Sequence, residues 1–599
     1  MAAPYDCPMP ADLVIVNGRL FTGGDARSAD RWLAGSRDGP APDGVPDAVA
    51  IAAGRIAWLG ATSDARPWLG PETDVIDAHG GLVAPGFEDA HAHLRMGAES
   101  LLTVDLDSAT NIGDVREALR RWDGAHAHAR TEWLVGRGWH YGIFPGGIPD
   151  RARLDELVPD RPAVLESFDG HTHWLNSAAL ARAGIVRGGT DPPGGIVERD
   201  PVTSEPTGIL KEYGEWLHTE LLPQAPDAVL DEALRQAAAM IRRSGITAVQ
   251  EAWTELADLR RYARLRTQDP FDLRLRVALP ADPIDWADGP ERGRQRWGER
   301  IESYRAELAA AGTDEWLDGG IVKAFADGVI ESGTAWMLDP YEPGATLAGE
   351  PAGQSTWPPG ALAAMTEMAV EAGWQVEIHA IGDAAIRASL DAHEAAGALA
   401  RGRPASAARN GGEAGAPSAA AGAGGRAPGP RGRIEHVEWP DPADVPRFGA
   451  FGVVASMQPS HARSMPMEAA VRERQIGARV GRGWPWASIL RAGGVVAFGS
   501  DWPIAPFDPL VQLHAAVTRA DAAGWLPAER LTVAEALACA TWGGAYAARA
   551  EDRRGSLVAG HDADVVILDR DLLDGGPSAV PGTRIVATIC GGRVVYRAG

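Results

Sequence analysis

The stretch "GLVAPGFEDAHAHL", residues 81–94, decides the fold class of this chain. It begins as an apolar run and ends in acidic and histidine residues, among them His91 and His93. Side chains two residues apart on a strand point to the same side of the backbone, so these two imidazoles face one way. Paired imidazoles at the end of a buried strand are typical of metal binding, provided that further ligands come from elsewhere in the chain.

Seven more apolar, strand-like runs follow the first one and are mostly separated by segments of helical period. They are "ITAVQEA", "LRLRVAL", "GIVKAFADG", "QVEIHAIGD", "GRIEHVEW", "GVVASMQPS" and "VVAFGSDWP". Eight strands in a βα rhythm predict an α/β fold, a closed (β/α)8 TIM barrel. An open doubly wound sheet is disfavoured because no glycine-rich phosphate turn follows the first strand.

The two ends of the chain carry short β-branched runs with hairpin turns. They read "DLVIVNGRLFTG" and "AVAIAAGRIAWLG" near the start, and "DADVVILD" and "RIVATICGGRVVYRAG" near the end. Isolated hairpins are marginal in water, so we favour one small composite β-sandwich built from both termini over two separate hairpins. The predicted division is a sandwich from residues 1–83 and 552–599 and a barrel from residues 84–551.

Two segments do not fit the barrel rhythm. Residues 104–235 are too long for one crossover helix, and we expect an inserted subdomain there, after the first barrel strand. Residues 395–432 are rich in Ala, Gly, Pro and Arg and have few large apolar side chains. Such a composition cannot bury enough surface to order itself, so we expect a disordered loop.

Composition and charge exclude several classes of function. The chain has 599 residues, with 45% hydrophobic and 23% charged residues, which is ordinary for a globular protein. Its formal net charge of −24 argues against a nucleic-acid or anionic-membrane partner. The three cysteines follow no CxxC spacing, and neither a signal peptide nor a membrane-length apolar run is evident. We therefore expect a cytoplasmic protein.

Polar residues stand where five of the eight apolar runs end, which is the barrel mouth where such enzymes keep their chemistry. These residues are His91, His93, Lys323, His379, His436 and Asp501. A single histidine at a strand end is often a packing residue, but this set predicts a metal centre. By contrast, His126 and His128 also form a His-x-His motif, but no strand delivers them, and we expect a surface loop there.

A buried lysine at the mouth also needs an explanation, because burial disfavours its charge. A lysine with a lowered pKa can react with carbon dioxide, and the resulting carbamate can bridge two divalent ions. The alternative is that Lys323 remains an ammonium that pairs with Asp327 or Asp501.

Taken together, these motifs resemble the metal-dependent amidohydrolase superfamily. The phrases "KAFADG", "HAIGDAAI", "SMQPSHA", "FGSDWPIAPFDP" and "DGHTHWLNSAAL" are similar to the branch that includes N-substituted formamide deformylase. The resemblance implies a barrel with a composite β-sandwich, and hydrolysis of a C–N bond in a small non-peptide, linear amide. It also implies one or two Zn2+ ions held by the six residues above, with Asp501, His436 and His379 in catalytic roles.

Further residues are expected to line the substrate pocket. They are His171, Trp139, His140, Gln458, His461 and Trp502. Relatives usually carry Asp where this chain has His140, and Ser-Arg-Thr-Ala where it has residues 332–335, so the chemistry transfers more safely than the substrate. Aromatic residues near the mouth favour a small neutral amide with an apolar N-substituent.

Other functions compete with amide hydrolysis. A deaminase or a cyclic-amide hydrolase would use the same metal centre, and a non-catalytic binding protein could keep the fold. The last is disfavoured because the chain retains the full ligand set. The sequence leaves the oligomeric state open, and a homodimer is the one assembly that we consider.

Overall fold

The structure is a computed structural model of the chain. It describes residues 10–26, 46–125, 132–144, 147–192, 195–268, 271–345, 350–402, 431–462, 466–519 and 525–599. The motif at His126 and His128 lies outside these residues, as does most of the predicted loop 395–432. Residues 395–402 belong to helix α10 (Asp383–Gly402).

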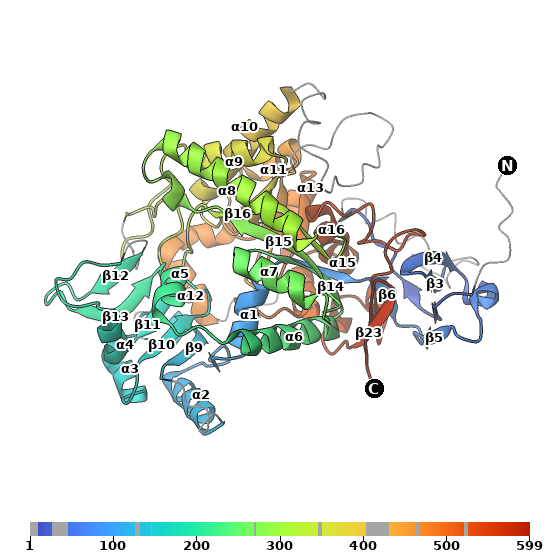
Figure 1. Ribbon diagram of the computed structural model, residues 1–599, viewed down its shortest axis with the longest axis horizontal. Helices are drawn as coiled ribbons and strands as arrows, with labels where there is room; N and C mark the ends of the chain where they lie inside the picture. Colours follow the sequence, from blue (N-terminus) through green and yellow to red (C-terminus); the bar gives the residue numbers. More distant parts are fainter. Residues whose placement is uncertain are drawn as a thin grey trace.

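Eight parallel strands form the central sheet and follow one another in the order of the chain (Figure 1). They are β7 (Phe87–Ala92), β14 (Ile246–Glu251), β15 (Arg274–Pro280), β16 (Leu317–Phe325), β17 (Gln375–Ala380), β18 (Arg433–His436), β19 (Val454–Met457) and β20 (Val495–Phe498). Every neighbouring pair from β7 to β20 is parallel. These are the eight strands that the sequence predicts, and the barrel class is confirmed.

The barrel closes between its first and last strands. Directly after β20, the Asp501 N–H donates to the carbonyl of His91 at 2.7 Å. The His93 N–H donates to the carbonyl of Trp502, also at 2.7 Å. The seam of the barrel is therefore held by the backbone of residues that the sequence places at the metal centre.

Helices cover the outside of the barrel between successive strands (Figure 1). They are α6 (Asp227–Arg243), α7 (Leu256–Leu265), α8 (Pro290–Ala311), α9 (Ala361–Glu371), α10, α11 (Val445–Phe451) and α13 (Trp486–Arg491). In α6, apolar residues such as Leu230, Leu234 and Ile241 recur every three or four positions and are buried, so one face packs on the sheet. The helix ends at Arg243, and Gly245 shortly after it has a φ of 83°, which few other residues adopt readily.

The remaining helices lie in the loops and the C-terminal part of the chain. They are α1 (Leu94–Ser100), α12 (Pro466–Ile476), α14 (Pro509–Thr518), α15 (Val533–Ala540), α16 (Trp542–Ala547) and α17 (Leu572–Gly575). Helix α1 begins directly after His93, and the Glu251 carboxylate accepts a hydrogen bond from the Leu94 N–H in its first turn. The end of β14 thereby positions the chain that follows the first histidine pair.

A six-stranded sheet is inserted between β7 and α6, at the left of Figure 1. Its strands, in the order β12-β13-β11-β10-β9-β8, are β8 (Val104–Asp105), β9 (Leu134–Trp139), β10 (Ala163–Ser167), β11 (Thr172–Leu175), β12 (Ile196–Arg199) and β13 (Pro206–Lys211). Its helices are α2 (Ile112–Ala125), α3 (Arg151–Leu157), α4 (Ser177–Arg182) and α5 (Gly214–Trp216). Because α6 is the first crossover helix of the barrel, the inserted sheet ends before Asp227.

Two further sheets lie at the right of Figure 1; one is built from N-terminal strands alone, and the other combines strands from both ends of the chain. One has the order β4-β3-β1-β5 and the other β2-β6-β21-β22-β23. The strands are β1 (Leu13–Val16), β2 (Arg19–Leu20), β3 (Ala48–Ala52), β4 (Arg55–Gly60), β5 (Asp74–Asp77), β6 (Leu82–Pro85), β21 (Val565–Leu568), β22 (Ile585–Cys590) and β23 (Arg593–Arg597). Strand β6 pairs antiparallel with β21, so the two termini share one sheet, and their buried side chains form one core.

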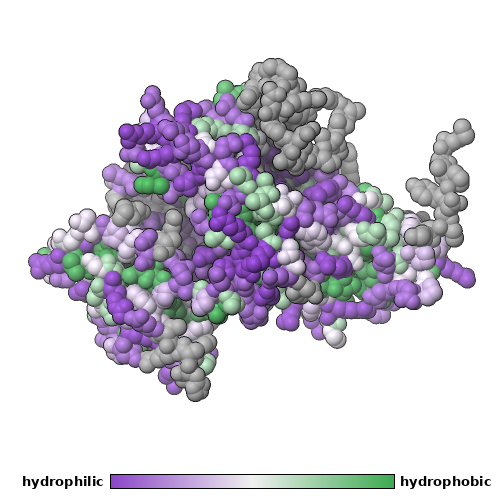
Figure 2. Space-filling view, in the orientation of Figure 1, coloured by the Kyte–Doolittle hydropathy of each residue, from purple (hydrophilic) through white to green (hydrophobic). Residues whose placement is uncertain are grey.

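The terminal sheets contact the barrel at the start of its strands. Arg274, the first residue of β15, donates from Nε to Asp564 at 2.7 Å, and Arg554 Nε donates to Glu88 at 2.8 Å. The inserted sheet contacts the barrel at the opposite end, where the barrel strands finish. The visible face of the molecule is mostly hydrophilic, with scattered apolar residues (Figure 2). Within the described residues, no helix is both long and apolar enough to cross a membrane.

Candidate metal centre

Three of the predicted ligands converge at the C-terminal mouth of the barrel. His91, His436 and Asp501 offer ligand atoms that all lie within 4.8 Å of one another, and all three side chains are buried. Asp501 Oδ1 is 3.4 Å from His91 Nε2 and 3.2 Å from His93 Nε2. Its second oxygen, Oδ2, is 3.8 Å from His436 Nδ1. One carboxylate thus faces three imidazoles, which is a donor set that suits a divalent ion.

Lys323 lies beside this cluster in the floor of the mouth. It is fully buried on β16, and its Nζ is 3.4 Å from His91 Nε2. Asp327, which is one of the predicted alternative partners of the lysine, instead accepts the backbone N–H groups of Ile381 and Gly382 at 3.1 and 2.8 Å. Burial lowers the pKa of the Lys323 ammonium, although nearby carboxylates, Asp501 among them, oppose this shift.

His379 stands next to the cluster rather than inside it. Its ring centroid is 4.4 Å from that of His436, and its Nε2 is 3.2 Å from the carbonyl of Gly328. Phe325, at the end of β16, packs against the same imidazole with a centroid distance of 4.9 Å. His379 therefore contacts one of the converging ligands and an aromatic side chain at the same time.

The protonation states favour metal ligation by most of the cluster. Burial lowers the pKa of His379 and of His436 well below the ordinary range, which keeps both imidazoles neutral. Burial alone would raise the pKa of Asp501, but the neighbouring imidazoles of His91, His93 and His436 hold that pKa well below its usual value. Burial and the Lys323 charge lower the pKa of His91, yet Glu435 and Asp501 outweigh them and raise it to about 9. A metal ion would have to displace that proton.

A buried ion network beneath the centre orients the first histidine. Glu435 Oε2 accepts from His91 Nδ1 at 2.6 Å, which leaves His91 Nε2 facing Asp501. Arg433 in turn donates from Nε to Glu435 at 3.0 Å, and its Nη1 lies 3.4 Å from Glu377 Oε2. A carboxylate on the distal nitrogen of a metal-binding histidine fixes the ring and its tautomer.

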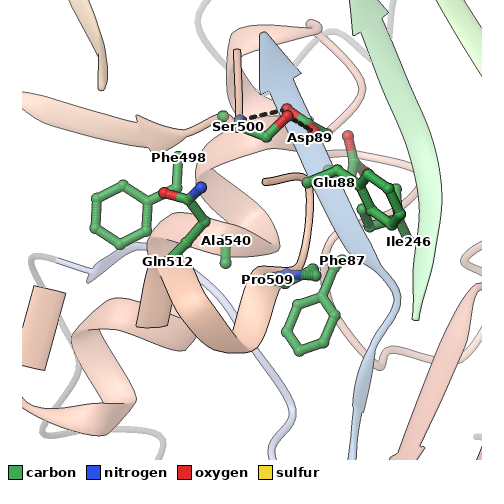
Figure 3. A pocket seen from close by; sticks show the side chains of 11 residues that line it. Phe87, Glu88, Asp89, Ile246, Phe498, Ser500, Pro509, Gln512 and Ala540 are labelled. Atoms are coloured by element: carbon green, nitrogen blue, oxygen red, sulfur yellow. Dashed lines mark hydrogen bonds between the residues drawn. The ribbon is translucent and has the colours of Figure 1, made fainter. Parts of the chain in front are cut away.

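Asp89 joins the first strand to the turn that carries Asp501 (Figure 3). Its carboxylate accepts from the Ser500 N–H at 2.8 Å, from the Ser500 hydroxyl, and from the His91 N–H at 3.2 Å. Asp501 has a φ of 59° and His436 a φ of 74°, both in the left-handed region that non-glycine residues rarely adopt. Such strain persists where surrounding contacts hold it, and it concentrates at functional sites.

Two residues that follow β19 line the same cluster. Gln458 Oε1 is 2.9 Å from His436 Nδ1, and His461 Nε2 is 3.8 Å from Asp501 Oδ2. The other nitrogen of His461 is 3.4 Å from Glu438 Oε1. Both residues, which the sequence predicts as pocket residues, therefore lie next to the converging side chains.

Another predicted pocket residue, His171, comes from the inserted sheet. Its ring centroid is 5.8 Å from that of His379, and its Nδ1 is 2.7 Å from Glu212 Oε2. The insertion thus reaches the mouth of the barrel at this point.

The other predicted pocket residues have different surroundings. Trp139 is fully buried among the aromatic residues of the insertion, and its Nε1 donates to the Leu165 carbonyl at 2.8 Å. His140 stacks on Phe168 at 4.8 Å, also within the insertion. Trp502 packs so closely on α1 that a Cβ on Gly97 would lie 2.0 Å from its ring. The structure does not bring Trp139 and His140 to the converging ligands.

Four residues that hold the histidines of the site in place are not predicted from the sequence. They are Glu212, Asp89, Glu435 and Arg433. The last two stand two residues apart in "RIEH", where charged residues alternate along a strand that is otherwise apolar. That alternation was a usable signal for side chains inside the barrel. Glu212 had no local signal, because its partner lies 41 residues away.

Comparison with known proteins agrees with this geometry. A family model described as "Amidohydrolase family" matches residues 74–596. Protein LONG AFTER FAR-RED 3 of Arabidopsis thaliana is 29% identical over 98% of this chain and 92% of its own length. N-substituted formamide deformylase of Arthrobacter pascens is 26% identical over 98% of each chain.

Among solved structures, an uncharacterized metal-dependent hydrolase from Pyrococcus horikoshii OT3 has a TM-score of 0.64 at 22% sequence identity. The match covers 94% of this chain and 98% of that one and shows that the two share a fold. The resemblance predicted from the motifs is confirmed. Because the family match spans the barrel, the insertion and the terminal strands from β5 onward, the chain belongs to the amidohydrolase family.

Proposed function

We infer that this protein hydrolyses a carbon–nitrogen bond of a small non-peptide amide, with an N-substituted formamide as the model substrate. The observation that carries the inference is the convergence of His91, His436 and Asp501 at the barrel mouth, with ligand atoms within 4.8 Å of one another. The relative named N-substituted formamide deformylase, which aligns along the whole chain, supports the choice of substrate.

The donor set fits zinc, which prefers imidazole and carboxylate ligands in proteins. His91, His93, His436 and Asp501 would hold an ion, and His379 and Lys323 would contribute if two ions bind. When bound, zinc lowers the pKa of water and polarises a carbonyl group. The buried Asp501 Oδ1 faces two imidazoles without a good hydrogen bond, and such an oxygen suits a cation as its partner.

A carbamate on Lys323 would supply the anion that two ions need between them. The neutral amine attacks carbon dioxide, an N–C bond forms and one proton is released. Complete burial of Lys323 and its lowered pKa favour the neutral amine that this reaction requires.

Asp501 is the group best placed to move protons. In our proposal it takes the proton of the attacking water and delivers it to the nitrogen of the leaving amine. A pKa well below the usual range keeps Asp501 ionised, so its carboxylate carries no proton before the attack. His436 or His379 would either hold a metal ion or stabilise the negative charge that develops on the carbonyl oxygen.

An aromatic pair next to His379 offers a place for an apolar N-substituent. Phe325 packs on the His379 ring, and Trp253 lies 5.4 Å from Phe325 between ring centroids. Both side chains are only partly buried. They replace Trp139 as support for an apolar pocket, since Trp139 lies in the core of the insertion. An apolar wall of this kind discriminates weakly, so a range of N-substituents should be accepted.

A substrate panel tests the proposal. We expect zinc-loaded protein to hydrolyse N-benzylformamide with a higher kcat/KM than N-acetylbenzylamine, and chelator-treated protein to be inactive until zinc is restored. An N-acyl amino acid, a cyclic amide and an aminopurine complete the panel. If only one of these three turns over, the formamide assignment is wrong, and the outcome identifies a deacylase, a cyclic-amide hydrolase or a deaminase.

A further inference from the structure

The inserted sheet sends one hairpin tip into the mouth of the barrel. Strands β10 and β11 are antiparallel neighbours, and residues 168–171 form the turn between them. The last residue of this turn, His171, places its ring 5.8 Å from that of His379. Its side chain is 16% exposed, so it is not closed off from solvent.

The imidazole of His171 is not what folds this turn. The carboxylate of Asp169 does so, because its Oδ1 accepts from the His171 N–H at 3.1 Å and from the Ser167 hydroxyl. The Tyr141 hydroxyl lies 3.3 Å from the same oxygen. On the far side of the hairpin, Asn176 caps α4 through its own side chain. The ring of His171 is therefore available for a purpose other than turn formation.

Glu212 holds that ring in one orientation. Its Oε2 is 2.7 Å from His171 Nδ1, and its backbone N–H donates to the His171 carbonyl at 2.9 Å. An ionised carboxylate only accepts hydrogen bonds, so Nδ1 carries the proton and Nε2 is left for another partner. Glu212 has a φ of 61°, which a glutamate adopts only when its surroundings impose it.

Glu212 also lies close to the loop that follows β16, which contains Gly328 and Thr334. A Cβ added to Gly328 would lie 2.8 Å from Glu212 Oε1 and 2.1 Å from Thr334 Oγ1. The carbonyl of the same Gly328 lies 3.2 Å from His379 Nε2. The carboxylate that orients His171 thus lies between the insertion and the loop that contacts His379.

We propose that the inserted sheet supplies a substrate-contacting residue of this site, with His171 Nε2 hydrogen-bonding the substrate amide and Glu212 acting as its positioning residue. This inference rests on the proposed amide hydrolysis. It assigns to Glu212 a role that operates only through His171. It also makes the insertion a part of the site, since the barrel strands alone do not provide this contact.

A double-mutant cycle tests the two roles. We expect His171→Ala to lower kcat/KM for N-benzylformamide by at least about 30-fold, in the range of one lost polar contact to a reacting group. Glu212→Gln, which keeps the shape of the side chain, should lower it by about 10-fold. The double variant should be no worse than His171→Ala. Zinc content and Tm should match those of the wild type in all three variants.

The chain offers a matched control in the exposed pair of His79 and Asp77, whose Nδ1 and Oδ1 lie 3.3 Å apart. His79→Ala, Asp77→Asn and their double variant should leave kcat/KM unchanged. Multiplicative losses in the His171 and Glu212 cycle would overturn the positioning role of Glu212. A wild-type kcat/KM in His171→Ala would overturn the substrate contact. If His171→Ala is unstable, His171→Asn replaces it.

A binding measurement separates failure of this inference from failure of the proposed function. Benzohydroxamic acid carries an amide-like group that chelates zinc, and its Kd can be measured by calorimetry without turnover. We expect His171→Ala to weaken this Kd about 10-fold while the affinity for zinc is unchanged. A wild type that binds the hydroxamate but hydrolyses no amide contradicts the proposed function alone. An unchanged Kd in His171→Ala contradicts the contact.

Discussion

Asp501 is the residue on which the chemistry of the centre depends most directly. Its two oxygens face imidazoles from two strands and from His461, and its backbone closes the barrel seam. The structural alternative, a carboxylate that merely caps a helix, does not account for these neighbours, since the residue that caps α14 is Asp508.

Asp501→Asn should abolish most of the turnover and leave the fold intact. An amide keeps the size of the side chain but cannot accept the proton of the attacking water. We expect kcat to fall by about 10²–10⁴-fold, the usual contribution of a positioned acid–base group. Zinc content, measured by elemental analysis, should stay near that of the wild type. Near-normal turnover would remove Asp501 from the mechanism.

Lys323→Ala should reduce the amount of metal that the protein holds. The substitution removes either the carbamate or the ammonium, but only loss of a carbamate can be repaired by a small carboxylate. We therefore expect added propionate to restore part of the metal content and of kcat. Native mass spectrometry of the wild type should show the mass of one added carbon dioxide, and its absence together with failed rescue contradicts the carbamate.

At the scale of single elements, the sequence predicts where the barrel strands end. It does not predict which distant residues hydrogen-bond the histidines at those ends. Each apolar run that turns polar marks the end of a barrel strand, because period and polarity are local properties of the chain. The carboxylates that orient the histidines are different. Glu435 lies 344 residues from His91, and neither position contains information about the other.

The sequence also does not reveal which aromatic residues border the site. Trp139 stands near the expected mouth in the sequence, but it lies at the end of β9, where its side chain joins the buried core of the insertion. Phe325 ends a barrel strand and borders His379. Which side of a strand end faces the site depends on how two sheets pack, and one strand alone does not reveal this.

The link between β7 and the turn after β20 predicts a role for Asp89 in metal affinity. Asp89→Ala removes the acceptor for two Ser500 hydrogen bonds and for the His91 N–H. We expect zinc to bind about 10–100-fold more weakly, which is the usual loss of metal affinity when a residue that orients a metal ligand is replaced. Ser500→Ala, which removes the hydroxyl alone, should have a smaller effect. Equal zinc affinity in all three proteins would contradict this role.

Helix α10 contains a histidine that should make the fold sensitive to acid. His393 is buried, its Nε2 bonds the Arg433 carbonyl at 3.1 Å, and burial lowers its pKa to about 4. The ordinary pKa of histidine is about 6.5, so between these values the unfolded chain binds more protons than the native one. The stabilisation is present above pH 6.5 and is lost as the pH falls towards 4.

We expect the free energy of unfolding to drop by about 2 kcal/mol from this residue between pH 7 and pH 5. His393→Gln, which can still donate to the Arg433 carbonyl, should show a smaller drop in urea unfolding. The exposed His79, changed in the same way, serves as the control. An equal pH dependence in wild type and His393→Gln would contradict the prediction.

At the scale of the whole molecule, the barrel has a charged interior. Arg433 is fully buried between Glu435 and Glu377 and also donates to the carbonyl of Ala90 at 2.6 Å. A barrel of this class is more often filled with branched apolar side chains. The charges beneath the metal centre therefore stabilise the fold only as a complete, hydrogen-bonded set.

Arg433→Met should destabilise the protein by about 3–5 kcal/mol, because two buried carboxylates lose their partner. Urea unfolding at neutral pH measures the difference. Arg597, whose pair with Asp74 is largely exposed at 3.5 Å, offers the comparison, and Arg597→Met should change stability by less than about 1 kcal/mol. Similar losses of unfolding free energy in the two variants would show that the buried network contributes no more to stability than an exposed ion pair.

The sheet shared by the two termini has a consequence for biosynthesis. Strand β6 ends at Pro85 and its neighbour β21 begins at Val565, so nearly the whole barrel leaves the ribosome between them. At about 5–20 residues per second, strand β6 waits roughly 20–100 s for β21, its partner from the C-terminal part of the chain. An unpaired apolar strand edge is prone to aggregation during such a delay. Yield in the cell should therefore depend on translation speed and on chaperones that shield nascent chains.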